Sequence, residues 1–226
     1  MDTEPPHLVC VEGNIGAGKS TLLDSLKYRY SNDPSVVFID EPADEWETKG
    51  FLELAYNEQG VRPAFQHMVL LSLAGALMQA LARRPKPRVV ITERSPWGNY
   101  HVFAKANLSG NDLVIYKHAW EELIAKIKAT FKVKPRFLWL TAAKMISHQQ
   151  RIELRDRPSE RGISKSYLET LEQLHEKWLC HGENDKDAVA IATDAQRPLE
   201  VLRDAEIALR EWDLTPVGGY KEFICG

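Results

Sequence analysis

Short apolar runs alternate with longer amphipathic segments along the whole chain. The apolar runs are nearly continuous, as expected for strands of a parallel sheet that is covered on both faces. They are Leu8–Val11, Val36–Ile39, Val89–Thr92, Phe137–Leu140 and Ala188–Ala192. The segments with helical periodicity are Lys19–Tyr30, Pro63–Arg84, Val114–Thr130, Lys144–Leu154, Ser166–Leu179 and Pro198–Trp212. This alternation predicts the α/β class, with a doubly wound, parallel, five-stranded sheet.

In a sheet of this kind, ligands bind beyond the carboxyl ends of the strands. The residues that follow the predicted strands should therefore converge on one cleft. They are Glu12–Lys19, Asp40–Glu41, Glu93–Arg94, Thr141 and Thr193–Arg197. The polar groups among them are those that phosphoryl transfer needs.

Composition narrows the classes of partner. The formal net charge of −3 predicts no polyanion-binding surface, so nucleic acid is not an expected partner. Cys10, Cys180 and Cys225 are far apart and form no C-x-x-C pair. This spacing argues against a disulfide framework or a zinc site, and it favours a reducing compartment.

The longest mostly apolar run, Val69–Ala82, is shorter than the ~20 residues that span a bilayer. It also carries polar Ser72 and Gln79, so we predict a buried helix and no membrane association. The segment Met1–His7 is acidic and contains prolines, and the phosphate-binding loop follows closely, so we expect no signal peptide before the first strand. A cytoplasmic location is expected.

The strongest motif lies between the first strand and the first helix. It matches the phosphate-binding pattern G-x-x-x-x-G-K-[ST] at every required position. Its residues are Gly13, Asn14, Ile15, Gly16, Ala17, Gly18, Lys19, Ser20 and Thr21. Glycines let successive backbone N–H groups point at phosphate oxygens, and the helix adds its positive end. Lys19 supplies a charge for the β and γ phosphates, and the Ser20 hydroxyl can ligate Mg²⁺. The motif predicts a site for a nucleoside triphosphate.

Acidic residues at two further strand ends are candidates for the chemistry. Glu93 directly follows the predicted strand Val89–Thr92, at a position where a carboxylate holds Mg²⁺ in phosphate-loop enzymes. Arg94 beside it could contact the transferred phosphoryl group. Asp40 and Glu41 follow another strand. A carboxylate here could accept the proton of an attacking hydroxyl. Strand alternation predicts that only one of these two faces the cleft.

Two helices contribute further candidates. Arg151 and Arg155 share a helix face, and Arg157 follows in a loop. These guanidinium groups could close over a triphosphate, or they could form a solvated face paired with nearby acids. On another helix, the Gln66 amide offers a donor and an acceptor side by side, which suits the edge of a nucleobase.

The 226 residues are enough for one sizeable core, and no internal repeat or long linker divides them. We therefore predict a single domain over residues 1–226. It includes an arginine-rich lid at about 151–163 and ends in a tail, 213–226.

These segments together resemble the deoxynucleoside kinase family, over most of the chain from about Leu8 to about Arg197. The family includes deoxycytidine, deoxyguanosine and mitochondrial thymidine kinases and the insect multisubstrate enzyme. The matching segments, in order, are GNIGAGKST, EPADEW, the Phe65–Gln66 pair, ERS with Phe103 after it, RIELRDR with PSERGI, and YLETLEQLHEKWL. The ordered set is more specific than the phosphate-binding loop alone.

The resemblance implies ATP-dependent transfer of the γ-phosphoryl group to the 5′-hydroxyl of a deoxynucleoside. It implies that Glu41 is the general base, that Glu93 and Ser20 hold Mg²⁺, and that Arg94 and the lid arginines contact phosphoryl groups. The residues implied to bind the nucleoside are Trp46, Tyr56, Phe65, Gln66, Phe103 and Glu160. The residues implied to border the donor base are Thr193–Arg197, which include Asp194, Ala195 and Gln196. Family members are typically homodimers.

Departures from the family pattern bear on the choice of base. Deoxycytidine kinase reads cytosine with an arginine and an aspartate, and the corresponding positions here are Leu73 and Asn99. With Val69, Leu73 makes this wall apolar, which resembles the thymidine-accepting members. We therefore expect thymidine or another pyrimidine deoxynucleoside as acceptor. The alternatives are a thymidylate kinase, a broad-range deoxynucleoside kinase that also takes purines, and a non-catalytic relative.

Overall fold

The five strands form one parallel sheet. The computed structural model describes residues 4–142, 145–181, 187–193 and 197–221. The strands are β1 (His7–Gly13), β2 (Val36–Ile39), β3 (Val89–Glu93), β4 (Pro135–Thr141) and β5 (Ala188–Ala192). Their order in the sheet is β2-β3-β1-β4-β5, and every pair is parallel. The predicted α/β class and doubly wound sheet are therefore confirmed.

The strand order places the ends of β1, β2 and β3 side by side. In register, Val11 lies opposite Glu93, and Ile39 lies opposite Thr92. The segments that follow these strands are therefore neighbours in space, although they are far apart in the sequence. This edge of the sheet carries the phosphate-binding loop and both predicted acidic positions.

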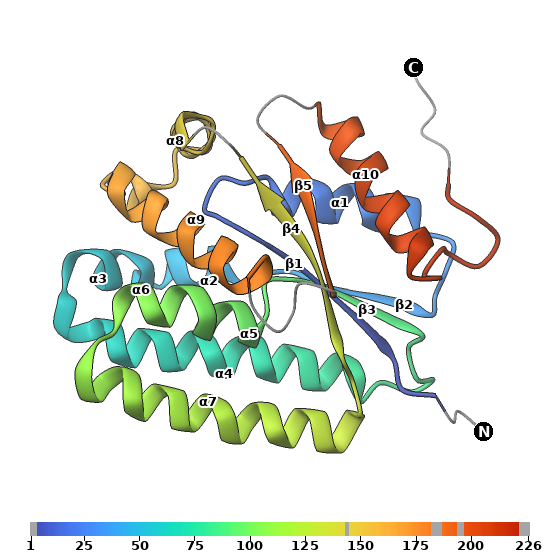
Figure 1. Cartoon of the computed structure of the whole chain (residues 1–226), viewed down its shortest axis with the longest axis horizontal. Coiled ribbons are helices and arrows are strands. Elements are labelled where there is room, and N and C mark those ends of the chain that lie inside the picture. Colours follow the sequence, from blue (N-terminus) through green and yellow to red (C-terminus); the bar gives the residue numbers. More distant parts are fainter. Residues whose placement is uncertain (1–3, 143–144, 182–186, 194–196, 222–226) are drawn as a thin grey trace.

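Helices cover both faces of the sheet (Figure 1). The longer ones are α1 (Lys19–Arg29), α4 (Arg62–Leu81), α7 (Gly110–Phe131), α8 (Met145–Arg155), α9 (Lys165–Leu179) and α10 (Pro198–Glu211). The shorter ones are α2 (Ala43–Thr48), α3 (Phe51–Asn57), α5 (Pro96–Gly98) and α6 (Lys105–Asn107). Single turns of 3-10 helix cover Gln59–Val61 and Pro158–Glu160, and a π-helix covers Asn99–Ala104.

Alternation along β1 divides the core into two layers. Leu8 and Cys10 face one cluster, which includes residues of α4, α7 and α9. Val9 and Val11 face the opposite cluster, which includes residues of α1 and α10. Because both faces of the strand are buried, its sequence reads as a continuous apolar run.

The helix that contains Val69–Ala82 is part of this core. The stretch Gln59–Leu81 is long and apolar enough to cross a membrane by length and composition alone. In the fold, α4 packs against α7 and β3, and Leu70, Leu77 and Leu81 are buried. Helix α4 ends at Leu81, before the predicted Arg84, and Pro63 occupies its second position.

Candidate active site

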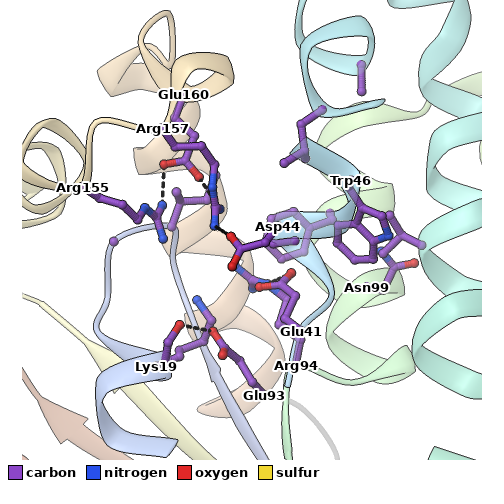
Figure 2. Close-up of a pocket in the computed structure, with 18 of the residues that line it drawn as sticks. Lys19, Glu41, Asp44, Trp46, Glu93, Arg94, Asn99, Arg155, Arg157 and Glu160 are labelled. Atoms are coloured by element: carbon purple, nitrogen blue, oxygen red, sulfur yellow. Dashed lines mark hydrogen bonds and ion pairs between the residues drawn. The ribbon is translucent and has the colours of Figure 1, made fainter. Parts of the chain in front are cut away.

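A cavity of about 510 Å³ opens at the carboxyl ends of β1, β2 and β3. Figure 2 shows Glu41 and Arg94 near the middle of the view and Lys19 and Glu93 below them, with Arg155, Arg157 and Glu160 on one side and Trp46 and Asn99 on the other. Most residues predicted for the site line this cavity. They are Ile15, Gly16, Gly18, Lys19, Ser20, Thr21, Glu41, Trp46, Tyr56, Phe65, Gln66, Val69, Glu93, Arg94, Asn99, Phe103, Arg151, Arg155, Arg157 and Glu160.

Some predicted residues lie elsewhere. Gly13, Asn14 and Ala17 shape the phosphate-binding loop without lining the cavity, and Asn14 donates to the Leu168 carbonyl at 2.8 Å and to Glu172 at 3.0 Å. Leu73 does not line the cavity; it is buried behind Trp46 and Val69 in their apolar cluster. Asp194, Ala195 and Gln196 lie outside the described residues.

Glycines are needed in the loop for backbone geometry and for space. Gly13 and Gly16 have φ angles of +146° and +75°. A Cβ atom on Gly13 would lie 2.5 Å from the Leu140 carbonyl oxygen, and one on Gly16 would lie 2.7 Å from that of His148. Gly18 is left-handed with φ +94° and ends the loop where α1 begins. Only glycine meets both demands without strain.

Lys19 is buried at the start of α1 and is already oriented by the loop. Its Nζ donates to the Asn14 carbonyl at 2.9 Å. Burial, and after it the nearby positive charge of Arg94, lower the pKa of Lys19 to about 8. A bound phosphate group would add negative charge beside this ammonium, to that of the nearby Glu41 and Glu93 carboxylates.

Ser20 and Glu93 place two oxygen ligands together, because the Ser20 hydroxyl donates to Glu93 Oε1 at 2.9 Å. Burial raises the pKa of Glu93, and nearby Lys19 opposes that rise. No group of three or more His, Cys, Asp or Glu suited to a metal occurs among the described residues. A hydroxyl and one carboxylate fit Mg²⁺, which usually takes its remaining ligands from water and substrate phosphates.

Arg94 links the two halves of the cavity. Its Nε donates to Glu41 Oε1 at 2.7 Å, and its Nη1 donates to the Gly13 carbonyl at 3.0 Å. The guanidinium also lies over the Phe103 ring, 4.2 Å from the centroid. Arg94 therefore fixes the Glu41 carboxylate relative to the phosphate-binding loop.

Behind Arg94, Glu12 is a fully buried carboxyl group on β1. It accepts a hydrogen bond from the Ser95 hydroxyl through one oxygen, and its other oxygen has no partner among the described residues. Burial raises the pKa of Glu12 to about 7, against the opposing effect of Arg94. Glu12 does not line the cavity.

Both acids after β2 line the cavity, which corrects the expectation that only one would. Strand β2 ends at Ile39, so strand alternation does not extend to Asp40 and Glu41. The two differ in environment instead. Asp40 is exposed and pairs with Lys27, whereas Glu41 is held by Arg94.

The lid arginines all reach the cavity, and each has protein partners. Arg151 Nη1 donates to Thr193 Oγ1 at 3.1 Å and to the loop carbonyl of Gly16 at 3.4 Å. Arg155 and Arg157 both pair with Glu160. Asp156, another nearby acid, pairs instead with Arg161 at 3.0 Å.

Two acids of α2 hold the lid over the cavity. Arg157 Nη2 donates to Asp44 Oδ1 at 2.6 Å. The backbone N–H of Ser159 donates to Glu47 Oε1 at 3.1 Å, and its hydroxyl donates to the other Glu47 oxygen. Sequence patterning missed Asp44 and Glu47 because α2 is too short to show periodicity.

Aromatic and apolar side chains enclose the other half of the cavity. Trp46 and Phe65 meet edge to face with centroids 6.1 Å apart, and Val69 lies beside them. Tyr167 also lines this part, where its hydroxyl accepts from Asn107 Nδ2 at 2.8 Å. The helical periodicity of Ser166–Leu179 alone does not distinguish a cavity-lining hydroxyl from a side chain packed in the core.

A buried relay fixes the orientation of the Gln66 amide. The Tyr116 hydroxyl donates to Asn99 Oδ1, and Asn99 Nδ2 donates to Gln66 Oε1 at 3.1 Å. Burial raises the pKa of Tyr116, so its phenol remains a donor. Gln66 therefore presents its carbonyl to Asn99 and keeps its N–H₂ for another partner. Tyr116 lies outside the cavity, and no sequence motif pointed to it.

Comparison with known proteins gives a consistent result. The deoxynucleoside kinase family profile matches residues 9–208. A thymidine kinase of Ictalurid herpesvirus 1 is 34% identical over 213 residues, which cover 91% of this chain and 86% of that protein. Deoxycytidine kinase of Mus musculus is 30% identical and covers 76% of this chain and 75% of its own length. Mitochondrial thymidine kinase 2 of Homo sapiens is 27% identical, with coverage of 80% and 68%.

Proposed function

The chain belongs to the deoxynucleoside kinase family, and from that premise we propose that it transfers the γ-phosphoryl group of ATP to the 5′-hydroxyl of thymidine. The observation that carries this proposal is the Arg94–Glu41 pair at 2.7 Å. This pair places a carboxylate between the phosphate-binding loop and an enclosed aromatic pocket, where an acceptor hydroxyl has to lie.

The donor half of the cavity carries several groups that favour phosphate binding. Backbone N–H groups of the loop and the end of α1 face the phosphates, and Lys19 adds a charge beside them. Ser20 and Glu93 would hold Mg²⁺, which neutralises phosphate charge when it is bound. Arg151, Arg155 and Arg157 line the same side of the cavity and can exchange their present partners for phosphate oxygens. They stabilise the charge that develops during transfer.

Glu41 is proposed to take the proton of the 5′-hydroxyl as that oxygen attacks phosphorus. Arg94 holds the carboxylate by one oxygen, Oε1, so that Oε2 is left to accept the proton. Most of the rate acceleration in this type of transfer comes from positioning and electrostatics. The fixed distance between Glu41 and the loop serves that positioning.

Recognition of the base is assigned to the relay that ends at Gln66. Thymine and cytosine present their adjacent donor and acceptor in opposite order along the pairing edge. An amide held in one orientation by Asn99 therefore distinguishes between them, and the apolar wall at Val69 suits the thymine methyl group. The thymidine kinase name of the herpesvirus relative also supports this preference.

Two further proposals accompany the activity. We propose a homodimer formed through α4 and α7, since these helices pack together and leave Leu71, Val114 and Ile115 more than 60% exposed (65%, 67% and 62%). Large apolar residues exposed in this way mark contact surfaces. The cytoplasmic location stays a prediction from cysteine spacing.

One kinetic panel tests the reaction. Thymidine, deoxycytidine, deoxyadenosine, deoxyguanosine and thymidylate are each offered with ATP and Mg²⁺, and kcat/KM is measured by ADP release. Thymidine is expected to have the highest value. A purine deoxynucleoside with the highest value would contradict the base assignment, and preferential phosphorylation of thymidylate would contradict the deoxynucleoside kinase reaction.

The neighbouring acids offer a matched test of the base. Glu41→Gln keeps the shape of the side chain but cannot accept the proton, so we expect kcat to fall by about 10²–10⁴-fold. Asp40→Asn changes an exposed residue that pairs with Lys27 and should leave kcat within about twofold. Equal losses in the two variants would exclude the assigned role of Glu41.

A further inference from the structure

A second cavity, of about 840 Å³, lies away from the active site. It is bordered by the end of α7, the first residues of β4, the end of α9 and the segment from α5 to α6. Figure 1 shows where α7 leads into β4, at the end of the sheet opposite the phosphate-binding loop. No residue lines both cavities.

The charged side chains that line this cavity are all positive among the described residues. Five lysines line it, Lys105, Lys128, Lys132, Lys134 and Lys177, and no carboxylate does so among the described residues. Lys134 pairs with Asp187 at its edge. Partial burial lowers the pKa of Lys105, and the charges of Lys177 and Lys117 lower it further. In a chain whose net charge is −3, this cluster is a local concentration of positive charge.

The aromatic side chains of His101, Trp120 and Trp178 line the cavity together with these lysines, and we refer to them as its aromatic floor. His101 and Trp178 are parallel, with centroids 5.0 Å apart and 2° between their planes, and Trp120 meets His101 edge to face at 5.4 Å. His101 and Trp120 are half-buried, so parts of their rings remain accessible. Burial lowers the pKa of His101 to about 3, so its ring is neutral. The buried indole N–H of Trp178 has no partner among the described residues.

We propose that this cavity is a second nucleotide-binding site, with phosphates against the lysines and the base against the aromatic rings. Lysine ammonium groups bind phosphates as point charges, and aromatic faces accept any base by stacking. The volume is in the range of small-molecule sites, roughly 300–1,000 Å³. A metal ion does not fit, because the described lining has no carboxylate. An apolar ligand would give no partner to the four lysines other than Lys134, which alone of the five pairs with a described carboxylate.

Two elements extend from one cavity to the other, and this limits which residues can be changed. The π-helix carries Asn99 and Phe103 in the active site and His101 in the second cavity. Helix α9 carries Tyr167 at one end and Lys177 at the other. Substitution of the aromatic floor would therefore disturb the active site, whereas the exposed lysines can be replaced without moving either element.

The test counts ATP molecules per chain by isothermal titration calorimetry. The wild-type chain is expected to bind two, one at each site. The double variant K128E/K177E should bind one, with affinity at the second site reduced by about tenfold or more. The control K126E/K165E removes one exposed lysine from each of the same helices outside both cavities, and it should still bind two. Circular dichroism melts confirm that both variants fold.

Lys19→Ala separates this proposal from the proposed function. This variant should lose the active-site ATP and keep the second one. If the Lys19→Ala variant still binds two ATP molecules, the assignment of the donor site fails and the second site stands. If K128E/K177E still binds two, the second site is refuted and the donor site stands.

Ligand fragments test the chemistry of the second site in the Lys19→Ala variant. Tripolyphosphate should bind at least tenfold more weakly than ATP, because it lacks a base, and adenosine should show no detectable binding, because it lacks phosphates. Equal affinity for tripolyphosphate and ATP would reduce the site to an anion site and overturn the stacking role. Tighter lysine-dependent binding of a single-stranded oligonucleotide would identify a nucleic-acid surface and refute the proposal.

Discussion

Tyr116 is a residue outside the active-site cavity that sets what the cavity can recognise. Its hydroxyl holds Asn99, which holds Gln66. Tyr116→Phe removes the donor, so the Asn99 amide can turn over and the Gln66 amide with it. We expect the ratio of kcat/KM for thymidine over deoxycytidine to fall by about three- to tenfold, the equivalent of one hydrogen bond.

Tyr100→Phe is the matched control, because Tyr100 stacks near Tyr116 in the same aromatic cluster and makes no hydrogen bond to Asn99 in the structure as described. Its thymidine to deoxycytidine ratio should match the wild type. A ratio that is unchanged in Tyr116→Phe as well would show that the relay does not control base choice.

Glu12 should make stability depend on pH. Its pKa is raised from 4.5 to about 7 by burial, so between these values the folded chain holds a proton that the unfolded chain releases. The contribution of this proton to the free energy of unfolding is fully present below about pH 4.5. It decreases as the pH rises and is lost above about pH 7. Glu12→Gln resembles the protonated acid, so it should match the wild type at pH 5 and exceed its stability at pH 8 by about 1–3 kcal/mol.

Urea unfolding at pH 5 and pH 8 measures this difference. Exposed Glu211→Gln serves as the control and should show no such pH-dependent gain. If Glu12→Gln shifts the free energy of unfolding equally at both pH values, the buried proton does not account for the pH dependence.

At the scale of elements, α2 acts as the support on which the lid rests. Glu47 accepts the backbone N–H and the hydroxyl of Ser159, while Asp44 accepts from Arg157. Glu47→Ala removes the Ser159 contacts and leaves the Arg157 pair. We expect amide hydrogen exchange over residues 157–161 to rise by roughly fivefold, since local opening becomes less costly.

Exchange read out by mass spectrometry checks this against Glu45→Ala. Glu45 lies on the same helix and pairs only with exposed Lys49 in the described structure, so its loss should leave lid exchange unchanged. Equal protection of the lid in Glu47→Ala and the wild type would mean that other contacts hold it closed.

The bounds of the strands and helices show which elements the sequence could predict. Strands β2 and β5 have the predicted bounds, because each coincides with an apolar run. Strands β1, β3 and β4 extend beyond their apolar runs by one to three residues, most of them polar, which the apolar pattern could not locate. Helices α2 and α3 and the π-helix Asn99–Ala104 were not predicted, since segments this short show no period.

In the candidate site, motifs located residues that follow a strand or belong to a loop with fixed spacing. They could not locate partners brought in by tertiary packing. Leu73 illustrates this limit: one turn beyond Val69, it shares a helix face with it but lies behind the wall. The choice between Asp40 and Glu41 is another example. Only Glu41 is held by Arg94, and Arg94 comes from the end of a different strand, so the sequence around the two acids does not show this contact.

At the scale of the whole molecule, the proposed dimer gives a mass prediction. Sedimentation should report twice the 25.7 kDa chain mass for the wild type. The variant L71E/I115E places charges on the exposed face of α4 and α7 and should sediment as a monomer. Leu154→Glu, which changes a still more exposed apolar residue on α8, should remain a dimer. A monomeric wild type, or equal masses for all three, would contradict the proposed interface.

The backbone of Arg94 connects the site to the stability of the whole chain. Its φ of +62° lies in the left-handed region, which costs a residue with a side chain about 1–2 kcal/mol and costs glycine almost nothing. If Glu41 were no longer used in catalysis, it would not need to be held by Arg94. Selection for stability alone would then favour glycine at position 94. A lineage that has lost catalysis should drift toward glycine there, so position 94 would report whether selection still acts on phosphoryl transfer.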